Sequence, residues 1–316
     1  SYRLFPWLYF NAPKREADEP NPLPPVYGPR SEELTRGASE SGQAGAEQAA
    51  DEKAKALERI PALAGNQIVA FYGKPGASTM GILGEYSKEK LATLLEAYAK
   101  LYDDANGELG VIPAFHIIYG TVWPEGNIGL LSASVVEEYV NFAAERGWLV
   151  FLDHQIGKYS VEEAMRALLP FLRYPNVHLA IDPEWRTLLP MKEIGSISGA
   201  EINEAQRMMD EYLRERGLPG IRMLLVHQFA PRMITQREQV RATFDRVVLV
   251  HNADGFGSPE LKRYSYRYNA EARNMPVKGF KLFLEPKVAG AGADRPLMKP
   301  EEVLALDPMP SIIMYQ

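Results

Sequence analysis

The chain has 316 residues, of which 46% are apolar and 24% are charged, values that are ordinary for a globular protein. It carries 35 Lys and Arg against 41 Asp and Glu, a formal net charge of −6. This balance, without a basic stripe, argues against binding to nucleic-acid phosphates or to an anionic membrane surface. The absence of cysteine excludes disulfides, thiolate metal sites and cysteine nucleophiles. No apolar run is long enough to predict a membrane-spanning segment.

The first 65 residues differ in composition from the rest. Six prolines lie between positions 13 and 29, and small and charged residues follow, with one solvated helix expected over residues 46–58. Such a stretch cannot build a core of its own, whereas the aromatic patch at residues 2–10 should not be left in water. We therefore predict an extended N-terminal arm, residues 1–65, that lies on the rest of the chain or on a neighbouring subunit.

The same arm bears on location and assembly. Its Pro/Ala/Glu-rich composition is typical of a surface-exposed stalk, and the chain begins at Ser1 rather than Met, so we expect an extracellular or cell-surface protein. An arm that covers a second copy would make the chain a homo-oligomer. The 24 prolines and the lack of cysteine are typical of a thermophile.

From residue 66 onward, short apolar runs alternate with longer amphipathic segments. Eight runs are predicted as strands, over residues 67–73, 111–118, 148–155, 177–184, 222–229, 246–252, 277–285 and 311–315. Helices are predicted to begin after five serines that precede apolar periodic segments, as N-caps do: Ser87, Ser132, Ser160, Ser198 and Ser258.

Strands that are apolar on both faces and separated by helices form a parallel sheet covered by helices. Eight such units in residues 66–316 predict an α/β fold, the closed (β/α)8 or TIM barrel. The alternative is an open doubly wound sheet. It is disfavoured because Gly73 and Gly76, which follow the first strand, lack the spacing of a dinucleotide-binding loop.

Polar residues gather where the predicted strands end, which is the end that carries the active site in such barrels. Four of the five histidines are among them. The residues expected to contact a substrate are Tyr72, His116, Trp123, His154, Gln155, Trp185, His227, Gln228, His251, Asn252, Asp254 and Tyr315. The carboxylates expected to act in catalysis are Asp153, Asp182, Glu184 and Glu285. Because strand ends are polar in every barrel, each of these side chains has a purely structural role as its alternative.

Asp182 and Glu184 are separated by one residue at the end of the fourth predicted strand. Side chains at i and i+2 of a strand point to the same side, so the two carboxylates are predicted to stand next to each other. Repulsion between like charges raises the pKa of one of them, which suits glycoside hydrolysis, where one carboxyl donates a proton and another supplies negative charge. The structural alternative is that Asp182 accepts backbone N–H bonds while Glu184 pairs with Arg186.

This Asp-x-Glu pattern resembles the acid motif of glycoside-hydrolase-like TIM-barrel proteins, namely the chitinase-type and barrel-type lysozyme families. The resemblance implies that Glu184 is the general acid and that Asp182 is the assisting carboxylate, which in chitinases orients the N-acetyl group of the substrate. The chitinase pattern has further Asp residues upstream, where this chain has Val177 and Ala180, and this departure bears on the N-acetyl-assisted mechanism. The whole chain is also similar to uncharacterised bacterial surface proteins that are predicted to be barrels.

The first of three functional hypotheses is a hydrolase of a polysaccharide or cell-wall glycan. Glu184 would be the proton donor, and the second carboxylate would be Asp153, Asp182 or Glu285. Lys281 shares a face with Glu285 on the seventh strand, so Glu285 is its expected partner inside the barrel. The aromatic rings of Trp123 and Trp185 would stack on sugars, and no cofactor or metal ion is expected.

Two other hypotheses stay open. A metal-dependent hydrolase would use the histidines together with Asp153 or Asp254. Against it, the chain has neither a His-x-His strand motif nor a His-Glu-x-x-His helix, and His154 faces away from Asp153 on its strand. The third hypothesis is a non-catalytic surface or assembly protein that uses the arm as a connector.

Overall fold

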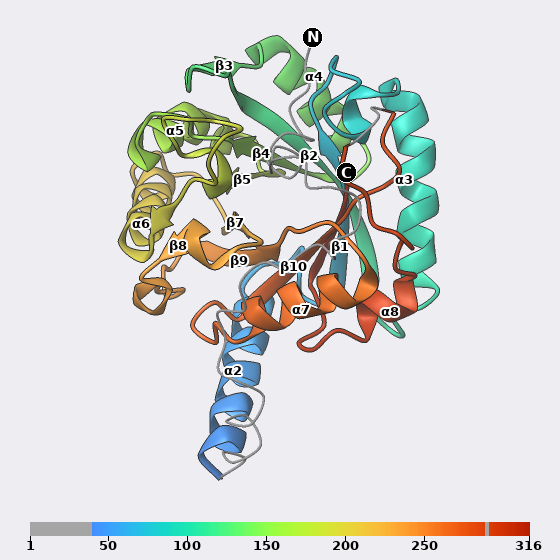
Figure 1. The fold of residues 1–316 in the computed structure, drawn as a ribbon, viewed down its shortest axis with the longest axis vertical. Coiled ribbons are helices and arrows are strands. Elements are labelled where there is room, and N and C mark those ends of the chain that lie inside the picture. Colours follow the sequence, from blue (N-terminus) through green and yellow to red (C-terminus); the bar gives the residue numbers. More distant parts are fainter. Residues whose placement is uncertain (1–39, 288–290) are drawn as a thin grey trace, which may run out of the picture.

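Eight parallel strands form a closed barrel, as the sequence predicts (Figure 1). The computed structural model describes residues 40–287 and 291–316, so the predicted arm up to residue 39 lies outside these ranges. The barrel strands are β1 (Asn66–Gly73), β2 (Gly110–Val122), β4 (Leu149–His154), β5 (Val177–Ile181), β7 (Arg222–Gln228), β9 (Val247–Ala253), β10 (Val277–Leu282) and β11 (Ile312–Tyr315). Each pairs with its neighbours in chain order, and β11 and β2 both pair with β1, which closes the sheet.

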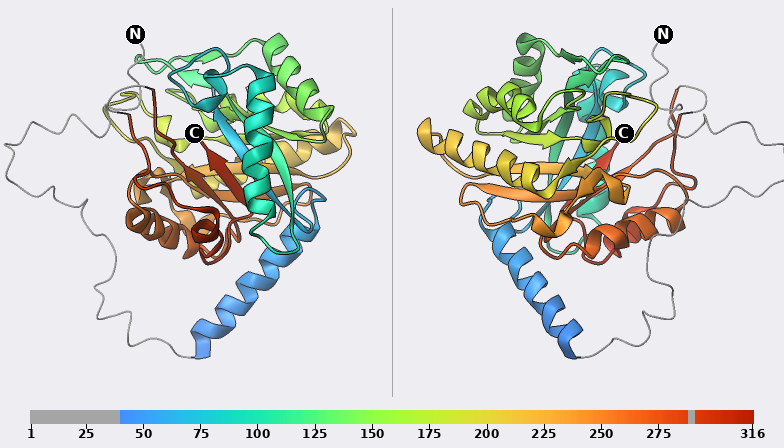
Figure 2. Two further views of the ribbon diagram at one scale, coloured as in Figure 1. Left: turned by 90° about the vertical axis from the view of Figure 1, so that its right-hand side faces the viewer. Right: turned by 60° about the vertical axis from the view of Figure 1, so that its left-hand side comes forward.

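Helices cover the outside of the barrel (Figures 1 and 2). They are α3 (Lys88–Asp103), α4 (Ala133–Ala144), α5 (Val161–Leu168), α6 (Gly199–Glu215), α7 (Pro259–Ala270) and the short α8 (Pro300–Leu304). The five predicted serine caps are confirmed, since each hydroxyl accepts a hydrogen bond from a backbone N–H of the first helical turn. Ser160 and Ser198 also form capping boxes with the Glu three residues later.

The connections contain smaller elements. β2 is longer than predicted and turns back at the barrel mouth into the antiparallel strand β3 (Ile128–Leu130). Two short parallel strands, β6 (Ile197–Ser198) and β8 (Ile234–Thr235), pair with each other outside the barrel. Single 3₁₀ turns are η1 (Ile82–Gly84), η2 (Leu169–Arg173), η3 (Pro183–Trp185), η4 (Pro231–Met233) and η5 (Arg237–Gln239). Between β7 and β9, where every residue is described, η4 and η5 replace the expected helix.

The strands alternate between two apolar layers because successive side chains of a strand point to opposite faces. One layer fills the lumen of the barrel, and the strand residues in it are Ile68, Ala70, Tyr72, Ala114, Ile118, Phe151, Ala180, Met223, Leu225, Val248, Val250, Val277, Ile312 and Met314. The other packs beneath the helices and includes Val69, Phe115, Leu152, Leu179, Val226, Leu249 and Ile313. This alternation decides which side chains at the strand ends face the lumen.

Helix α2 (Glu40–Glu58) extends away from the barrel (Figures 1 and 2). Near its end, Lys53 Nζ donates a hydrogen bond to the Met309 carbonyl at 2.7 Å. After the helix, Ile60 and Leu63 are each 2% exposed and pack into the lumen layer. These two side chains extend the lumen layer on the side opposite the polar strand ends.

Candidate active site in the barrel lumen

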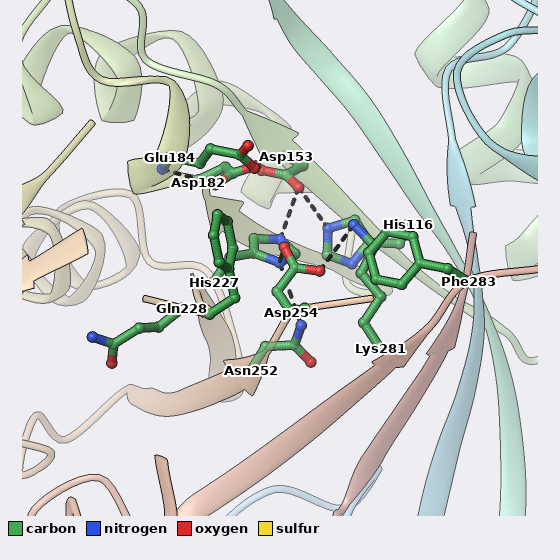
Figure 3. A network of polar contacts seen from close by, with 12 residues as sticks. His116, Asp153, Asp182, Glu184, His227, Gln228, Asn252, Asp254, Lys281 and Phe283 are labelled. Atoms are coloured by element: carbon green, nitrogen blue, oxygen red, sulfur yellow. Dashed lines mark hydrogen bonds and ion pairs between the residues drawn. The ribbon is translucent and has the colours of Figure 1, made fainter. Parts of the chain in front are cut away.

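The polar strand-end residues that continue the lumen layer form one buried cluster (Figure 3). We call it the lumen cluster; its members are Tyr72, His116, Asp153, Asp182, Glu184, His227, Asn252, Asp254 and Lys281. Apart from the half-buried Glu184, every member is at most 6% exposed. The even spacing within each strand places these side chains inward, as the sequence predicts for a barrel mouth.

Asp153 joins two histidines from neighbouring parts of the barrel. Its Oδ2 atom lies 3.0 Å from Nε2 of His116 and 3.0 Å from Nε2 of His227, and all three side chains are fully buried. The His116 ring stacks on Phe151 of the lumen layer at a centroid distance of 5.4 Å. Asp153 therefore ties β2, β4 and β7 together at the mouth.

A second carboxylate continues this network. Asp254 Oδ2 lies 3.1 Å from Nδ1 of His227, and its Oδ1 lies 3.2 Å from Nζ of Lys281. The Lys281 ammonium also lies 3.6 Å from the centroid of the Tyr72 ring, a cation–π contact. The predicted pairing of Lys281 with Glu285 is thus wrong, because Asp254 is its partner.

The charges of these groups balance in pairs. Burial opposes ionisation of Asp153, but the adjacent His227 and His116 outweigh it and hold the pKa of Asp153 well below its usual range. Burial likewise opposes the charge of His227, yet Asp153 and Asp254 raise its pKa to about 10. Burial lowers the pKa of His116 to about 4, against the attraction of Asp153. The pKa of Asp254 is lowered despite burial, by Lys281 and His227.

Asp182 and Glu184 have no such counter-charge. β5 ends at Ile181, and Asp182 begins the turn η3, where its Oδ1 accepts a hydrogen bond from the Glu184 N–H at 3.1 Å. Arg186 lies 3.3 Å from Glu201 and is not their partner. Within the described ranges neither carboxylate forms an ion pair, and Figure 3 shows the two side chains next to each other and to Asp153.

Without a paired counter-charge, both acids have a raised pKa. Burial, together with the charges of Asp153 and Asp254, raises the pKa of Asp182 to about 7, although His227 and Lys281 pull it down. Burial and then the charge of Asp182 raise the pKa of Glu184 well above its usual range. The cluster thus holds two carboxylates that stay ionised next to two carboxyls that hold protons near neutral pH.

Several residues predicted to contact substrate form other contacts instead. Nδ1 of His154 accepts a hydrogen bond from the Ile156 N–H, and Gln155 Oε1 accepts one from the Val122 N–H. Gln228 bonds to His251, and the Tyr315 hydroxyl bonds to that of Tyr102. Apart from Gln155, which follows the end of β4, each of these predicted residues is next in its strand to a lumen-facing residue, and its side chain therefore points to the opposite face. The structure does not bring them to the cluster.

Three further predicted residues lie in loops at the mouth. Glu285 is 67% exposed and accepts two hydrogen bonds from Arg295 at 2.7 and 2.9 Å. β10 ends at Leu282, so strand alternation no longer directs Glu285 inward. Trp185 is buried, and the half-buried Trp123 packs against Gly129.

A cavity of about 140 Å³ lies between the loops that follow β1, β9 and β10. Its lining includes Tyr86, Phe256, Phe283, Glu285 and Gln316. No member of the lumen cluster lines this cavity, but the Phe283 ring, which does, lies 5.0 Å from Nζ of Lys281.

A buried ion pair that the sequence analysis did not detect holds these loops. Lys262 of α7 donates to the carbonyls of Gly255 and Lys281, each at 2.6 Å, and lies 3.0 Å from Asp294 Oδ2. Asp294 in turn accepts hydrogen bonds from the N–H groups of Gly257 and Phe283. The pair fixes the segments that carry Asp254 and Lys281. No sequence signal marks it, since Lys262 lies in the middle of a polar helix.

The sequence matches no family model and no curated protein. Among solved structures, the chain is similar to an oxaloacetate acetylhydrolase in complex with oxalate (14% identity, 83% of this chain and 80% of that chain, TM-score 0.48). It is also similar to a family 18 chitinase from Flavobacterium johnsoniae (9% identity, 79% and 87%, TM-score 0.44) and to a chitinase from Ipomoea carnea (11% identity, 78% and 94%, TM-score 0.43). At these TM-scores the similarities give no information about the activity of this chain.

The described helices include none that combines the length and the apolar character needed to cross a membrane.

Breaking the buried Lys262–Asp294 pair should be costly. We expect Lys262→Met to lower the free energy of unfolding by about 3–5 kcal/mol, because it leaves Asp294 buried without a counter-charge. Arg263→Met is the matched control, since its partner Glu302 lies 2.8 Å away at a position where both side chains are about 40% exposed. That variant should lose about 0–1 kcal/mol in urea unfolding. Equal losses in the two variants would contradict the role of the pair.

Asp182 should make stability depend on pH. Its pKa is raised on folding, so as pH rises from about 4 to 7 the unfolded chain ionises first and the free energy of unfolding falls. Asp182→Asn cannot ionise, and its amide oxygen can still accept from the Glu184 N–H. We expect the variant to gain on the order of 2 kcal/mol relative to wild type between pH 5 and pH 8. Urea unfolding with EDTA present measures this difference, and a pH-independent difference would contradict the prediction.

Proposed function

We propose that the protein is a glycoside hydrolase in which Glu184 is the general acid. The supporting observation is the separation of pKa values inside the lumen cluster: Asp182 and Glu184 hold protons near neutral pH, while Asp153 and Asp254 stay ionised. Environments that push the pKa values of neighbouring carboxyl groups apart are the mark of acid–base sites. Cleavage of a glycosidic bond needs a neutral carboxylic acid next to a source of negative charge.

The assignment of the acid follows from exposure. Glu184 is half-buried whereas Asp182 is 2% exposed, so Glu184 is the carboxyl that can reach the leaving oxygen of a bound sugar. The loss of a proton from Asp182 raises the pKa of Glu184 through like-charge repulsion. Asp182 therefore loses its proton first, at a pKa of about 7, and carries the negative charge above that pH while Glu184 stays protonated.

The other two carboxylates support this pair rather than replace it. Asp153 is fully buried between two histidines, and Asp254 is held by His227 and Lys281. Both are committed to protein partners, so we assign them to keeping the field around Asp182 negative. A glycan is the proposed substrate class because aromatic rings, including Tyr86, line a cavity between the loops at the barrel mouth and offer flat apolar faces to a sugar.

The variant Glu184→Gln tests the assignment. It keeps the shape of the side chain but cannot donate the proton, so we expect hydrolysis to fall by about 10²–10⁴-fold. In wild type, activity should fall as pH rises through the raised pKa of Glu184. The residual activity of Glu184→Gln should not fall over the same pH range. Cleavage is measured on a panel of chitin, glucan and cell-wall oligosaccharides, with EDTA present.

The control is Glu193→Gln, an exposed carboxylate in the loop that follows the same strand, which should retain full activity. Unaltered cleavage by Glu184→Gln would contradict the role of Glu184. Failure of the wild-type chain to cleave any glycan of the panel would contradict the proposed function.

A further inference from the structure

His116, Asp153 and His227 form a compact set of metal-ligand atoms. One ligand atom from each side chain lies within 4.8 Å of the others, and all three residues are buried. Two imidazoles and one carboxylate are the donor set that first-row divalent transition ions favour. The three residues come from β2, β4 and β7, so no short sequence motif could reveal them.

The distances agree with coordination to one ion. Ligand nitrogen and oxygen atoms lie about 2.1 Å from such an ion, so neighbouring ligands at right angles are about 3.0 Å apart and opposite ligands about 4.2 Å apart. Asp153 Oδ2 lies 3.0 Å from each of the two Nε2 atoms. One ion between the three atoms therefore requires only small side-chain movements.

The surroundings of His227, though not those of His116, match those of a metal-bound histidine. A histidine that binds a metal through one nitrogen nearly always donates its other N–H to a carboxylate or a carbonyl. Nδ1 of His227 faces Asp254 Oδ2 at 3.1 Å, and Lys281 holds the other oxygen of Asp254. This leaves Nε2 of His227 directed at Asp153 and His116.

Two buried atoms in the set, Nδ1 of His116 and Oδ1 of Asp153, have no hydrogen-bond partner within the described ranges. Buried carboxylate oxygens without a donor are rare in proteins, and a cation beside Asp153 would compensate this charge.

We propose that His116, Asp153 and His227 bind one divalent transition-metal ion of the Mn²⁺, Fe²⁺, Co²⁺ or Zn²⁺ class, with Asp254 orienting His227. The ion would take the place of the proton that otherwise joins Asp153 to His227.

The test uses the full chain without a polyhistidine tag, stripped with EDTA and dialysed. Co²⁺ is titrated while its visible absorption is recorded, and Zn²⁺ binding is measured by calorimetry. We expect one ion per chain, no comparable binding of Mg²⁺, and a rise in the melting temperature on adding Zn²⁺. A wild-type chain that binds neither Co²⁺ nor Zn²⁺ at one ion per chain would overturn the proposal.

Three variants locate the ion. Asp153→Asn and His227→Gln should each weaken binding by at least tenfold, and Asp254→Asn should weaken it by about 10–100-fold through the loss of orientation. His251→Gln is the matched control, because His251 is a buried strand histidine that bonds Gln228 outside the set, and it should bind as wild type does. Unchanged binding in both folded Asp153→Asn and His227→Gln would place the ion elsewhere and contradict the assignment.

Circular dichroism establishes that each variant folds. Should the Asp153 or His227 variants unfold, X-ray absorption of the Zn²⁺-loaded wild type decides the question. Two imidazole ligands and oxygen donors around the ion are expected, and a ligand shell without imidazole would overturn the proposal.

Discussion

A single buried oxygen, Asp153 Oδ2, organises the polar interior of this barrel. It lies 3.0 Å from both His116 and His227, and the second carboxylate, Asp254, continues the network to Lys281. The cations His227 and Lys281 are thereby matched by the carboxylates Asp153 and Asp254. Asp182 and Glu184 face the same interior without a counter-charge of their own, which explains why both hold protons near neutral pH.

The strand pattern made much of this arrangement predictable. All eight strands and the five serine caps follow from periodicity and from N-cap residues, because these signals are local. The alternation of side chains predicted that Asp182 and Glu184 share one side and that His154 faces away from Asp153, while the structure shows that Asp153 and Asp182 face the lumen. Alternation also directs His227 and Asn252 to the lumen and their neighbours Gln228 and His251 to the opposite face. Position near a strand end alone does not distinguish the two groups.

Other features depend on three-dimensional contacts that leave no local trace. The Lys262–Asp294 pair joins a helix to a loop 32 residues further along the chain, and its two residue types are unremarkable in the sequence. Glu285 was placed in the lumen by extending the strand, but β10 ends three residues earlier and Glu285 pairs with Arg295 in solvent. The predicted domain division at residue 65 stays a prediction. Of the predicted arm, Lys53, Ile60 and Leu63 contact the barrel, and residues 1–39 lie outside the described ranges.

The two proposals use different parts of one cluster. The acid pair Asp182 and Glu184 lies beside Asp153, whereas the proposed ion lies on the far side of Asp153, between the two histidines (Figure 3). A cation there would stabilise the ionised form of Asp182, so the state of one part affects the other. The metal-free chain is therefore the form in which the acid pair is best observed.

The most direct test is a ¹³C NMR titration of the side-chain carboxyl groups in the metal-free chain, assigned with Asp182→Asn and Glu184→Gln. The account predicts that the signals lost in these two variants titrate near pH 7 or above, as neutral acids in a buried and negative environment do. If both carboxyl groups titrate near pH 4, the usual value for Asp and Glu, the interior does not hold its acids protonated and the account is contradicted.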